Sequence, residues 1–179
     1  ASGEEREGTE FLIANMPLPD LASLSGDLLV ENVALACSAW KQAPWGGLIP
    51  KDVFLNLVIP YASVNEKREA WRPKFFESFS REAWACASMG EAVRMLNREV
   101  FKRNTVKYNA TLPERANQSP AESIRIGYAS CTGLTILLVN ACRACGIPAR
   151  LAGVPLWKDK DGGNHSWTEV WTGEWHSIG

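Results

Sequence analysis

The chain has 179 residues, of which 46% are hydrophobic and 22% are charged. A chain of this size can bury one sizeable core, so we expect one compact unit rather than two complete domains. With 19 basic and 20 acidic side chains the formal net charge is -1, and the composition therefore argues against nucleic acid and anionic membranes as partners. No apolar run reaches the ~18 residues that a membrane-spanning helix needs.

The start of the chain and its cysteine count bear on its origin and its thiols. The chain begins at Ala1 without Met and without a basic and apolar leader, which indicates a processed protein or a fragment. A secreted or periplasmic location is favoured over a cytoplasmic one. Five cysteines are an odd number in a chain too long to need a disulfide scaffold. At least one thiol is therefore expected to be unpaired.

The first 110 residues are predicted to be mainly helical. Residues 1–10 carry charges and glycines and are expected to form a mobile end. From Asp20 onward, leucine and valine recur at helical spacings into the run LLVENVALACSAW, which predicts the first long helix. The stretch APWGGLIP has the prolines and glycines that end a helix.

Three more helical segments are expected before the chain turns polar. Residues 51–60 predict a short helix that a proline stops. Residues 65–86 are predicted to be helical, with a junction between two helices near Pro73. A further helix from about residue 88 to 103 begins with a serine and a glutamate at capping-box spacing.

The C-terminal part, residues 111–179, has a different character. A polar, proline-bearing connection leads to a helical run from Cys131 to Cys145, which a glycine and a proline stop. Three strands are then predicted at residues 149–157, 165–171 and 175–178, with a glycine-rich turn at 158–164. Helices first and an antiparallel sheet last predict an α+β fold.

The strand HSWTEVW alternates strictly, so His165, Trp167, Glu169 and Trp171 share one face. The chain holds 8 tryptophans, and Trp167, Trp171 and Trp175 cluster beside this histidine in the sequence. Aromatic side chains most often pack into a core. Trp167 and Trp171 could instead line a substrate site beside the histidine, and both alternatives stay open.

Cys131 stands in the run GYASCTGLTILLVN, where small polar residues precede an apolar helix. This places its sulfur at a helix N-terminus, where unpaired N–H groups and the positive end of the helix dipole favour an anion. The thiolate is the nucleophilic form, and the same N–H groups point to where an oxyanion develops in acyl transfer. Cys131 is therefore the candidate nucleophile, with buried packing as the alternative.

A thiol nucleophile of this kind needs a base, and the chain has only two histidines. His165 follows a glycine-rich segment and opens a predicted strand, at an element end where functional residues concentrate. His176 lies inside the next strand. We favour His165 as the base, although spacing alone cannot establish its contact with Cys131.

Cys142 and Cys145 form a C-x-x-C pair, which raises the alternative of a zinc site. Both lie inside the predicted helix and no second C-x-x-C exists, whereas the paired ligands of structural zinc sites are found on turns. We expect buried packing for these two thiols and for Cys37 and Cys86. No metal and no cofactor is expected.

Two ordered motifs place the cysteine and the histidine in a family. The run GYASCTGLTILLVNACRACGIPAR followed by NHSWTEVWTGEWHSIG resembles the transglutaminase-like superfamily, in which a small-residue-Cys helix, a G-I-P-A-R turn and H-x-W-x-E-V follow one another. The resemblance covers about residues 124–179. It implies a papain-like α+β fold and acyl transfer through a thioester, with Cys131 as the nucleophile and His165 as the base.

The same resemblance implies a third catalytic residue, an acid that orients the imidazole. Its matching place is Gly179, the last residue, so the acid is expected beyond the given sequence, together with the remaining strands of a papain-like sheet. A shifted alignment or an impaired site are the alternatives. Glu169 and Glu174 are possible substitutes, but Glu169 matches a common non-catalytic glutamate, for which a structural ion pair is expected.

The family also has a second oxyanion donor, a side chain some three dozen residues before the cysteine. Asn97 stands 34 positions before Cys131 and is the candidate, with a helix-surface or capping role as the alternative.

The leading prediction is a bacterial-type, transglutaminase-like cysteine peptidase or amidase that acts on a peptide or isopeptide amide of a peptide or protein partner. Hydrolysis is favoured over cross-linking. The alternative is a catalytically inactive module for binding or assembly, whose helical N-terminal part is the interaction surface.

Overall fold

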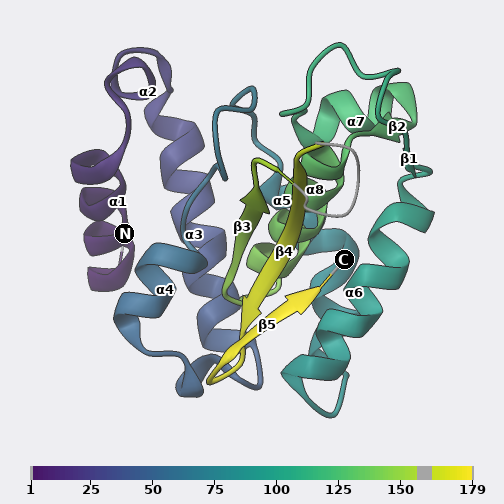
Figure 1. The fold of residues 1–179 in the computed structure, drawn as a ribbon. Helices are drawn as coiled ribbons and strands as arrows, with labels where there is room; N and C mark the ends of the chain where they lie inside the picture. The colour runs from purple at the N-terminus through teal and green to yellow at the C-terminus, as the bar shows by residue number, and fades with distance from the viewer. Residues whose placement is uncertain (1, 157–162, 179) are drawn as a thin grey trace.

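The computed structural model describes residues 2–156 and 163–178. Helices fill the first two thirds of the chain, and a three-stranded sheet forms its end (Figure 1). The elements in chain order are α1 (Gly3–Asn15), α2 (Leu18–Ser23), α3 (Gly26–Gln42), the 3-10 turn η1 (Gly46–Leu48), α4 (Lys51–Leu57), α5 (Arg72–Trp84), α6 (Met89–Arg103), β1 (Lys107–Tyr108), α7 (Pro120–Ile126), β2 (Tyr128–Ala129), α8 (Cys131–Ala144), β3 (Ala149–Val154), β4 (His165–Trp171) and β5 (Trp175–Ile178).

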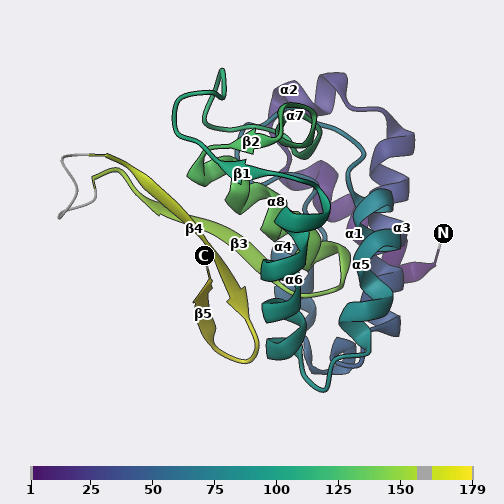
Figure 2. The same ribbon diagram turned by 90° about the vertical axis from the view of Figure 1, so that its right-hand side faces the viewer.

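Helix α8 is the centre of the molecule. The antiparallel sheet, in the order β3-β4-β5, lies against one side of it, and α5 and α6 pack against the other side. Figure 2 shows these two layers side by side, with the β3–β4 hairpin reaching beyond the helices. Twelve of the 14 residues of α8 are buried, which explains its nearly continuous apolar sequence. The predicted α+β class is confirmed.

The elements around α8 follow their local sequence signals closely. Helix α8 ends at Ala144 and is followed by Gly146, whose φ of 74° is the left-handed conformation that glycine adopts just after helix ends. Strands β4 and β5 have the predicted bounds and are joined through Gly173, with φ 108°. Helix α6 begins where predicted, with Ser88 Oγ accepting from the Glu91 amide (3.2 Å).

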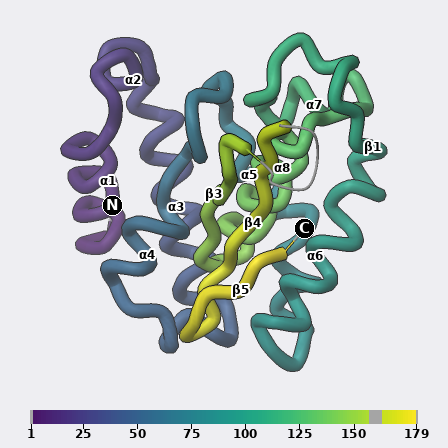
Figure 3. Tube along the Cα trace, viewed as in Figure 1, coloured from purple at the N-terminus to yellow at the C-terminus, as the bar shows by residue number. Residues whose placement is uncertain are grey.

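The prediction of a mobile end at residues 1–10 is wrong. Residues 3–10 belong to α1, which begins with a capping box between Ser2 and Glu5 (2.7 and 3.3 Å). Its glycine at position 8 packs closely on α3 and the segment after α4, because a Cβ there would lie 2.4 Å from Ile59 Cδ1. The Cα trace in Figure 3 follows α1 alongside α3. The contact between Gly8 and Ile59, which are far apart in the sequence, thus holds α1 in place although the composition of this segment is polar.

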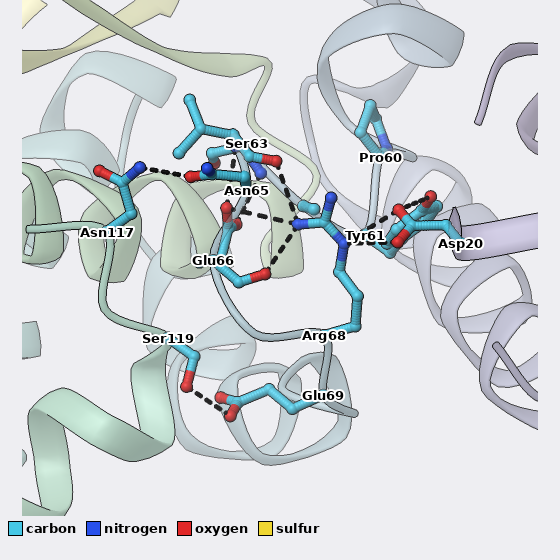
Figure 4. Close-up of polar contacts among 12 residues, drawn as sticks. Asp20, Pro60, Tyr61, Ser63, Asn65, Glu66, Arg68, Glu69, Asn117 and Ser119 are labelled. Carbon is cyan, nitrogen blue, oxygen red and sulfur yellow. Dashed lines mark hydrogen bonds and ion pairs between the residues drawn. The ribbon is translucent and has the colours of Figure 1, made fainter. Parts of the chain in front are cut away.

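The predicted helix at 65–86 forms only from Arg72 onward, as α5. The segment before it is instead an irregular loop held by side chains (Figure 4). Glu66 accepts from the backbone amides of Ser63 and Val64 (2.7 and 2.8 Å), so its carboxylate takes the place of a helical hydrogen-bond pattern.

Further side chains fix this loop on both flanks. On one flank, Asp20 accepts from Arg68 Nε (2.9 Å) and from the Tyr61 hydroxyl (2.7 Å). Burial and the Asp20 hydrogen bond raise the pKa of Tyr61 well above its ordinary value. On the other flank, Glu69 accepts from the Ser119 hydroxyl (2.8 Å), at the start of α7 (Figure 4). Tertiary contacts override the helical pattern here.

Two buried arginines join the N-terminal helices to α8. Arg72 is 1% exposed and donates to Asn32 Oδ1 (2.7 Å), to the carbonyl of Arg143 (2.9 Å) and to that of Val58 (2.8 Å). The Arg143 guanidinium donates to the carbonyl oxygens of Leu57, Pro60, Ala62 and Ala149. Burial and the neighbouring Arg143 lower the pKa of Arg72. These carbonyl dipoles offset the cost of burying the two cations.

Within residues 2–156 and 163–178, no helix combines the length and the apolar character needed to cross a bilayer.

A short parallel pairing of β1 with β2, which the sequence did not reveal, sets residue 128 beside residue 107 just before α8. The division at residues 110 and 111 into a helical part and a catalytic core stays a prediction.

Candidate active site

A pocket of about 330 Å³ lies between α6, α8 and the sheet. Its lining includes Cys131 at the start of α8, His165 at the start of β4, and Asn97 on α6. In Figure 1, β4 crosses in front of α8 while β5 runs toward α6. The packing of sheet on helix thus brings together three candidate residues that are far apart in the sequence.

The N-terminus of α8 is built to hold Cys131 in a fixed position. Ser130 caps the helix, with its Oγ accepting from the Gly133 amide (3.0 Å) and donating to the Ala116 carbonyl (2.7 Å). The carboxamide of Gln118, which is 2% exposed, accepts from the Ser130 amide and donates to the Tyr128 carbonyl, both at 3.0 Å. These bonds anchor the backbone on the N-terminal side of the cysteine.

Gly133 is required in the first turn of α8 by this close packing. A Cβ at this position would lie 2.8 Å from Gln118 Oε1 and 3.0 Å from Ala129 Cβ. Both distances are too short for an ordinary side chain, so the helix start and the preceding loop fit together only around a glycine.

Cys131 differs from the three buried thiols of the chain. It is partly exposed in the pocket, and its carbonyl accepts from Thr135 Oγ1 (2.8 Å). Cys37, Cys142 and Cys145 are buried, as expected. Burial raises the pKa of the Cys37 thiol to about 11 and that of Cys142 to about 12. These thiols are therefore protonated at neutral pH.

Two further observations concern the cysteines. Cys86 is partly exposed rather than buried, with its Sγ 3.5 Å from the Glu82 carbonyl oxygen, because it follows α5 at the surface. All five cysteines are free thiols. Among the described residues, no group of three or more His, Cys, Asp or Glu side chains is arranged to hold a metal ion.

His165 and His176 occupy different environments. His165 pairs with Val154 across the hairpin, lines the pocket with Cys131, and has its ring centroid 6.2 Å from that of Trp167 at an interplanar angle of 30°. His176 lies on β5 with 45% of its side chain exposed, 3.7 Å from Glu174, and does not line this pocket. Of the two histidines, His165 is the one that the fold brings to the cysteine's pocket.

The two candidate aromatic residues of β4, Trp167 and Trp171, lie in different environments. Trp167 lines the pocket. Trp171, at the far end of the strand, packs against the hydrophobic core instead and does not line it. Asn97 lies on the side of α6 that faces the pocket and is partly exposed. Its carboxamide makes no hydrogen bond within the residues described.

The candidate acids do not reach the pocket. Glu169 Oε2 accepts from Arg150 Nε (2.8 Å), so the expected structural ion pair is confirmed. The side chain of Glu174 is 81% exposed, beside His176. Gly179 lies outside the described residues, and within them no carboxylate lines the pocket.

Sequence reasoning missed the contacts that support the site. Thr132 Oγ1 and Ser166 Oγ lie 3.0 Å apart and join the start of α8 to β4. Gln118 lies 13 positions before the cysteine, inside a segment predicted to be only a connection. The sole sequence signal for the first pair was that each hydroxyl residue directly follows a candidate catalytic residue.

The chain is similar to a crystal structure of a candidate cysteine protease from Cytophaga hutchinsonii, with a TM-score of 0.52, 20% sequence identity and coverage of 68% of this chain. At this identity the likeness concerns the fold, and the chain spans only 40% of the length of that protein. No curated protein matches the chain.

A family match covers more than half of the chain. Residues 78–178 match the transglutaminase-like superfamily, a range that holds α6, α8 and the three-stranded sheet, and with them the lining of the pocket. The chain belongs to the transglutaminase-like superfamily.

Proposed function

We propose that this protein is a cysteine enzyme that cleaves peptide or isopeptide amides, with Cys131 as the nucleophile and His165 as the base. The observation that carries the proposal is that both side chains line one pocket, at the N-terminus of α8 and at the start of β4. Membership of the transglutaminase-like superfamily supports a thiol mechanism.

The first half of the proposed reaction forms a thioester. The Cys131 thiolate attacks the carbonyl carbon of the amide, and a tetrahedral intermediate with a negatively charged oxygen forms. When this intermediate collapses, the C–N bond breaks and the leaving amine takes a proton from the His165 imidazolium. The free amine departs and the acyl group stays on the sulfur.

The second half releases the acyl group. His165 takes a proton from a water molecule, whose oxygen attacks the thioester carbon, and the C–S bond breaks to give a carboxylic acid and the restored thiolate. An amine in place of water would give a new amide instead. The likeness to a candidate cysteine protease favours water as the acceptor.

The negatively charged oxygen of the tetrahedral intermediate is stabilised by hydrogen-bond donors close to the sulfur. The backbone amides at the first turn of α8 point toward this place, since the first N–H groups of a helix have no partner within it. Asn97, on the facing side of the pocket, supplies a carboxamide N–H as the second donor. Hydrolysis by these residues requires neither a metal nor a cofactor.

Thiol reactivity tests the proposal. At about pH 6.5, iodoacetamide should label Cys131 ~10-fold or more faster than Cys86, which is also partly exposed, because a thiolate held by an imidazolium reacts where an ordinary thiol does not. The buried thiols should stay unlabelled in the folded protein. Peptide mapping by mass spectrometry gives the rate at each cysteine.

The two histidines provide a matched pair of variants. His165→Ala should lower the rate at Cys131 to that of Cys86, while His176→Ala, on the exposed part of β5, should leave it unchanged. Equal labelling of Cys131 and Cys86 in the unaltered protein would contradict the enzyme proposal.

A second candidate is a catalytically inactive module that binds or assembles without cleaving. It is favoured by one observation, namely that no carboxylate lines the pocket within the described residues. The two candidates differ in acylation. Under the enzyme proposal, 4-nitrophenyl acetate gives a burst of nitrophenol and an acetyl group on Cys131, whereas the inactive module gives neither.

A further inference from the structure

The pocket continues from Cys131 into an apolar slot. Leu134 and Leu138 follow the cysteine at the i+3 and i+7 positions of α8, so all three side chains share one face of the helix. Phe101 on α6 and Ile178 at the end of β5 form the facing walls. We call these four side chains, Phe101, Leu134, Leu138 and Ile178, the apolar slot.

Among the described residues, the proposed Cys131–His165 pair is the only source of charge in the lining of this pocket. Within the described residues, its lining contains no Asp, Glu, Lys or Arg. Two of its hydroxyl groups are already occupied, because Thr135 Oγ1 donates to the Cys131 carbonyl and Ser166 Oγ bonds to Thr132. A charged group placed in the slot would lose its hydration without an Asp, Glu, Lys or Arg side chain to pair with, which disfavours its binding.

The volume suits a large side chain. The pocket measures about 330 Å³, whereas a cavity of roughly 150 Å³ lined by similar side chains accommodates a benzene ring. The Leu138 side chain is 2% exposed and forms the floor, while Leu134 and Phe101 are partly exposed along the walls. A phenyl or isobutyl group can therefore enter and displace water from apolar surface, which favours binding.

We propose that the apolar slot binds the uncharged, apolar side chain of the substrate residue whose carbonyl carbon is attacked by Cys131. The inference rests on the proposed function, because it takes the sulfur as the attacking atom. In the thioester the acyl carbon is bonded to Sγ, so the side chain on the next carbon lies within a few bonds of the sulfur, where the slot begins. The substrate class is thus an amide on the carboxyl side of residues such as phenylalanine or leucine.

Affinity labels test the slot without knowledge of the natural substrate. N-acetyl chloromethyl ketones of phenylalanine, leucine, aspartate and lysine place different side chains beside the same electrophile. The phenylalanine and leucine reagents should alkylate Cys131 at least ~10-fold faster than the two charged ones, after each rate is divided by the intrinsic reactivity toward a free thiol. Intact-protein and peptide mass spectrometry follow the modification.

Variants of the slot should change this preference. Leu134→Lys and, on the opposite wall, Phe101→Lys should each lower the ratio of phenylalanine to aspartate labelling by ~10-fold, because the new ammonium group pairs with the aspartate reagent. Leu28→Lys is the matched control, since this leucine on α3 is also partly exposed but does not line the pocket, and it should keep the original ratio.

The outcomes separate the two proposals. If iodoacetamide labels Cys131 selectively but the four ketones react at equal normalised rates, the slot is overturned and the thiol mechanism stands. If Cys131 shows no selective reaction even with iodoacetamide, the proposed function fails and the slot fails with it. An unchanged ratio in both lysine variants likewise overturns the slot.

Discussion

Thr132 Oγ1 and Ser166 Oγ lie 3.0 Å apart, and each belongs to the residue that directly follows one of the proposed catalytic pair. This contact ties the first turn of α8 to the first residues of β4, the two elements that carry Cys131 and His165. Thr132 is 8% exposed and Ser166 is partly exposed, so this hydroxyl pair is partly shielded from competing water.

Removing this hydrogen bond should impair the reaction without unfolding the protein. We expect Thr132→Val and Ser166→Ala each to slow alkylation of Cys131 by ~10-fold, because small displacements of reacting groups are costly. The pH profile of alkylation should also move toward that of His165→Ala, a shift that a purely structural role would not produce. Thr132→Ser keeps the hydroxyl and should retain the rate. The double variant should be no slower than either single one.

Asn97 should act in acyl transfer only. We expect Asn97→Ala to lower the burst rate with 4-nitrophenyl acetate by ~100-fold or more, as loss of an oxyanion donor does. Alkylation by iodoacetamide forms no oxyanion and should be unaffected. Asn56→Ala on α4, where the Asn56 amide only donates to the Asp52 carbonyl, is the control. Equal slowing of both reactions would show that Asn97 supports the fold instead.

Gln118 should contribute to the stability of the folded protein, because its carboxamide bonds to two backbone groups beside Cys131. Gln118→Met keeps the side-chain volume but leaves the Ser130 amide and the Tyr128 carbonyl without their partner. We expect the free energy of unfolding in urea to fall by about 2 kcal/mol. Gln42→Met changes a glutamine that bonds only to Ser38 at the surface and should cost less than ~0.5 kcal/mol. An equal loss of unfolding free energy in Gln118→Met and Gln42→Met would contradict this role of Gln118.

Arg72 should not be replaceable by lysine. A lysine ammonium has three donors on a flexible stem and cannot serve Asn32 and the surrounding carbonyls as the planar guanidinium does. We expect Arg72→Lys to lower the free energy of unfolding by about 3 kcal/mol. Arg98→Lys, with 69% of its side chain exposed, should stay close to the unaltered protein. Urea denaturation of both variants measures the difference.

Ionisation of Cys142 should lower the free energy of unfolding at alkaline pH. Its folded-state pKa is raised to about 12 by burial, above the ~8.5 of an unfolded thiol. The folded state therefore holds this proton longer, and the associated stability is present below about pH 8.5 and is lost as pH rises toward the folded value.

The test compares the slopes of stability against pH. Between about pH 8.5 and 10.5, the free energy of unfolding of Cys142→Ala should fall less steeply than that of the unaltered protein, by up to ~1.4 kcal/mol per pH unit. Val139→Ala, a truncation of an equally buried residue of α8, has no titrating group and should keep the original slope. Identical slopes for Cys142→Ala and the unaltered protein would refute the argument.

Local sequence signals predicted the C-terminal half of this fold well. The bounds of β4 and β5 matched because strict alternation and a glycine turn specify them within a few residues. The N-terminal signals were weaker. Helix α1 depends on Gly8 packing against Ile59, and residues 65–71 depend on Glu66, whose carboxylate binds the loop amides. Neither contact has a local signature.

The candidate site was predictable as residue types but not as a geometry. The sequence placed Cys131 at a helix start, because a small polar stretch ahead of an apolar run is a local feature. It could not show that His165 rather than His176 reaches the pocket, since this depends on how β4 crosses α8. The contact between Thr132 and Ser166 was likewise invisible, because it spans 34 positions.

Helix α8 is secured at its two ends by different parts of the chain. At its start, residues 116–118 bond to Ser130. At its end, the Arg143 carbonyl and guanidinium bond to Arg72 and to residues 57–62, which precede the family-matched range of 78–178. A fragment limited to residues 78–178 would lack Arg72 and residues 57–62. The buried Arg143 guanidinium and the C-terminal end of α8 would then lose these hydrogen-bond partners. We therefore expect residues 78–178 not to fold when they are produced without the segment that precedes them.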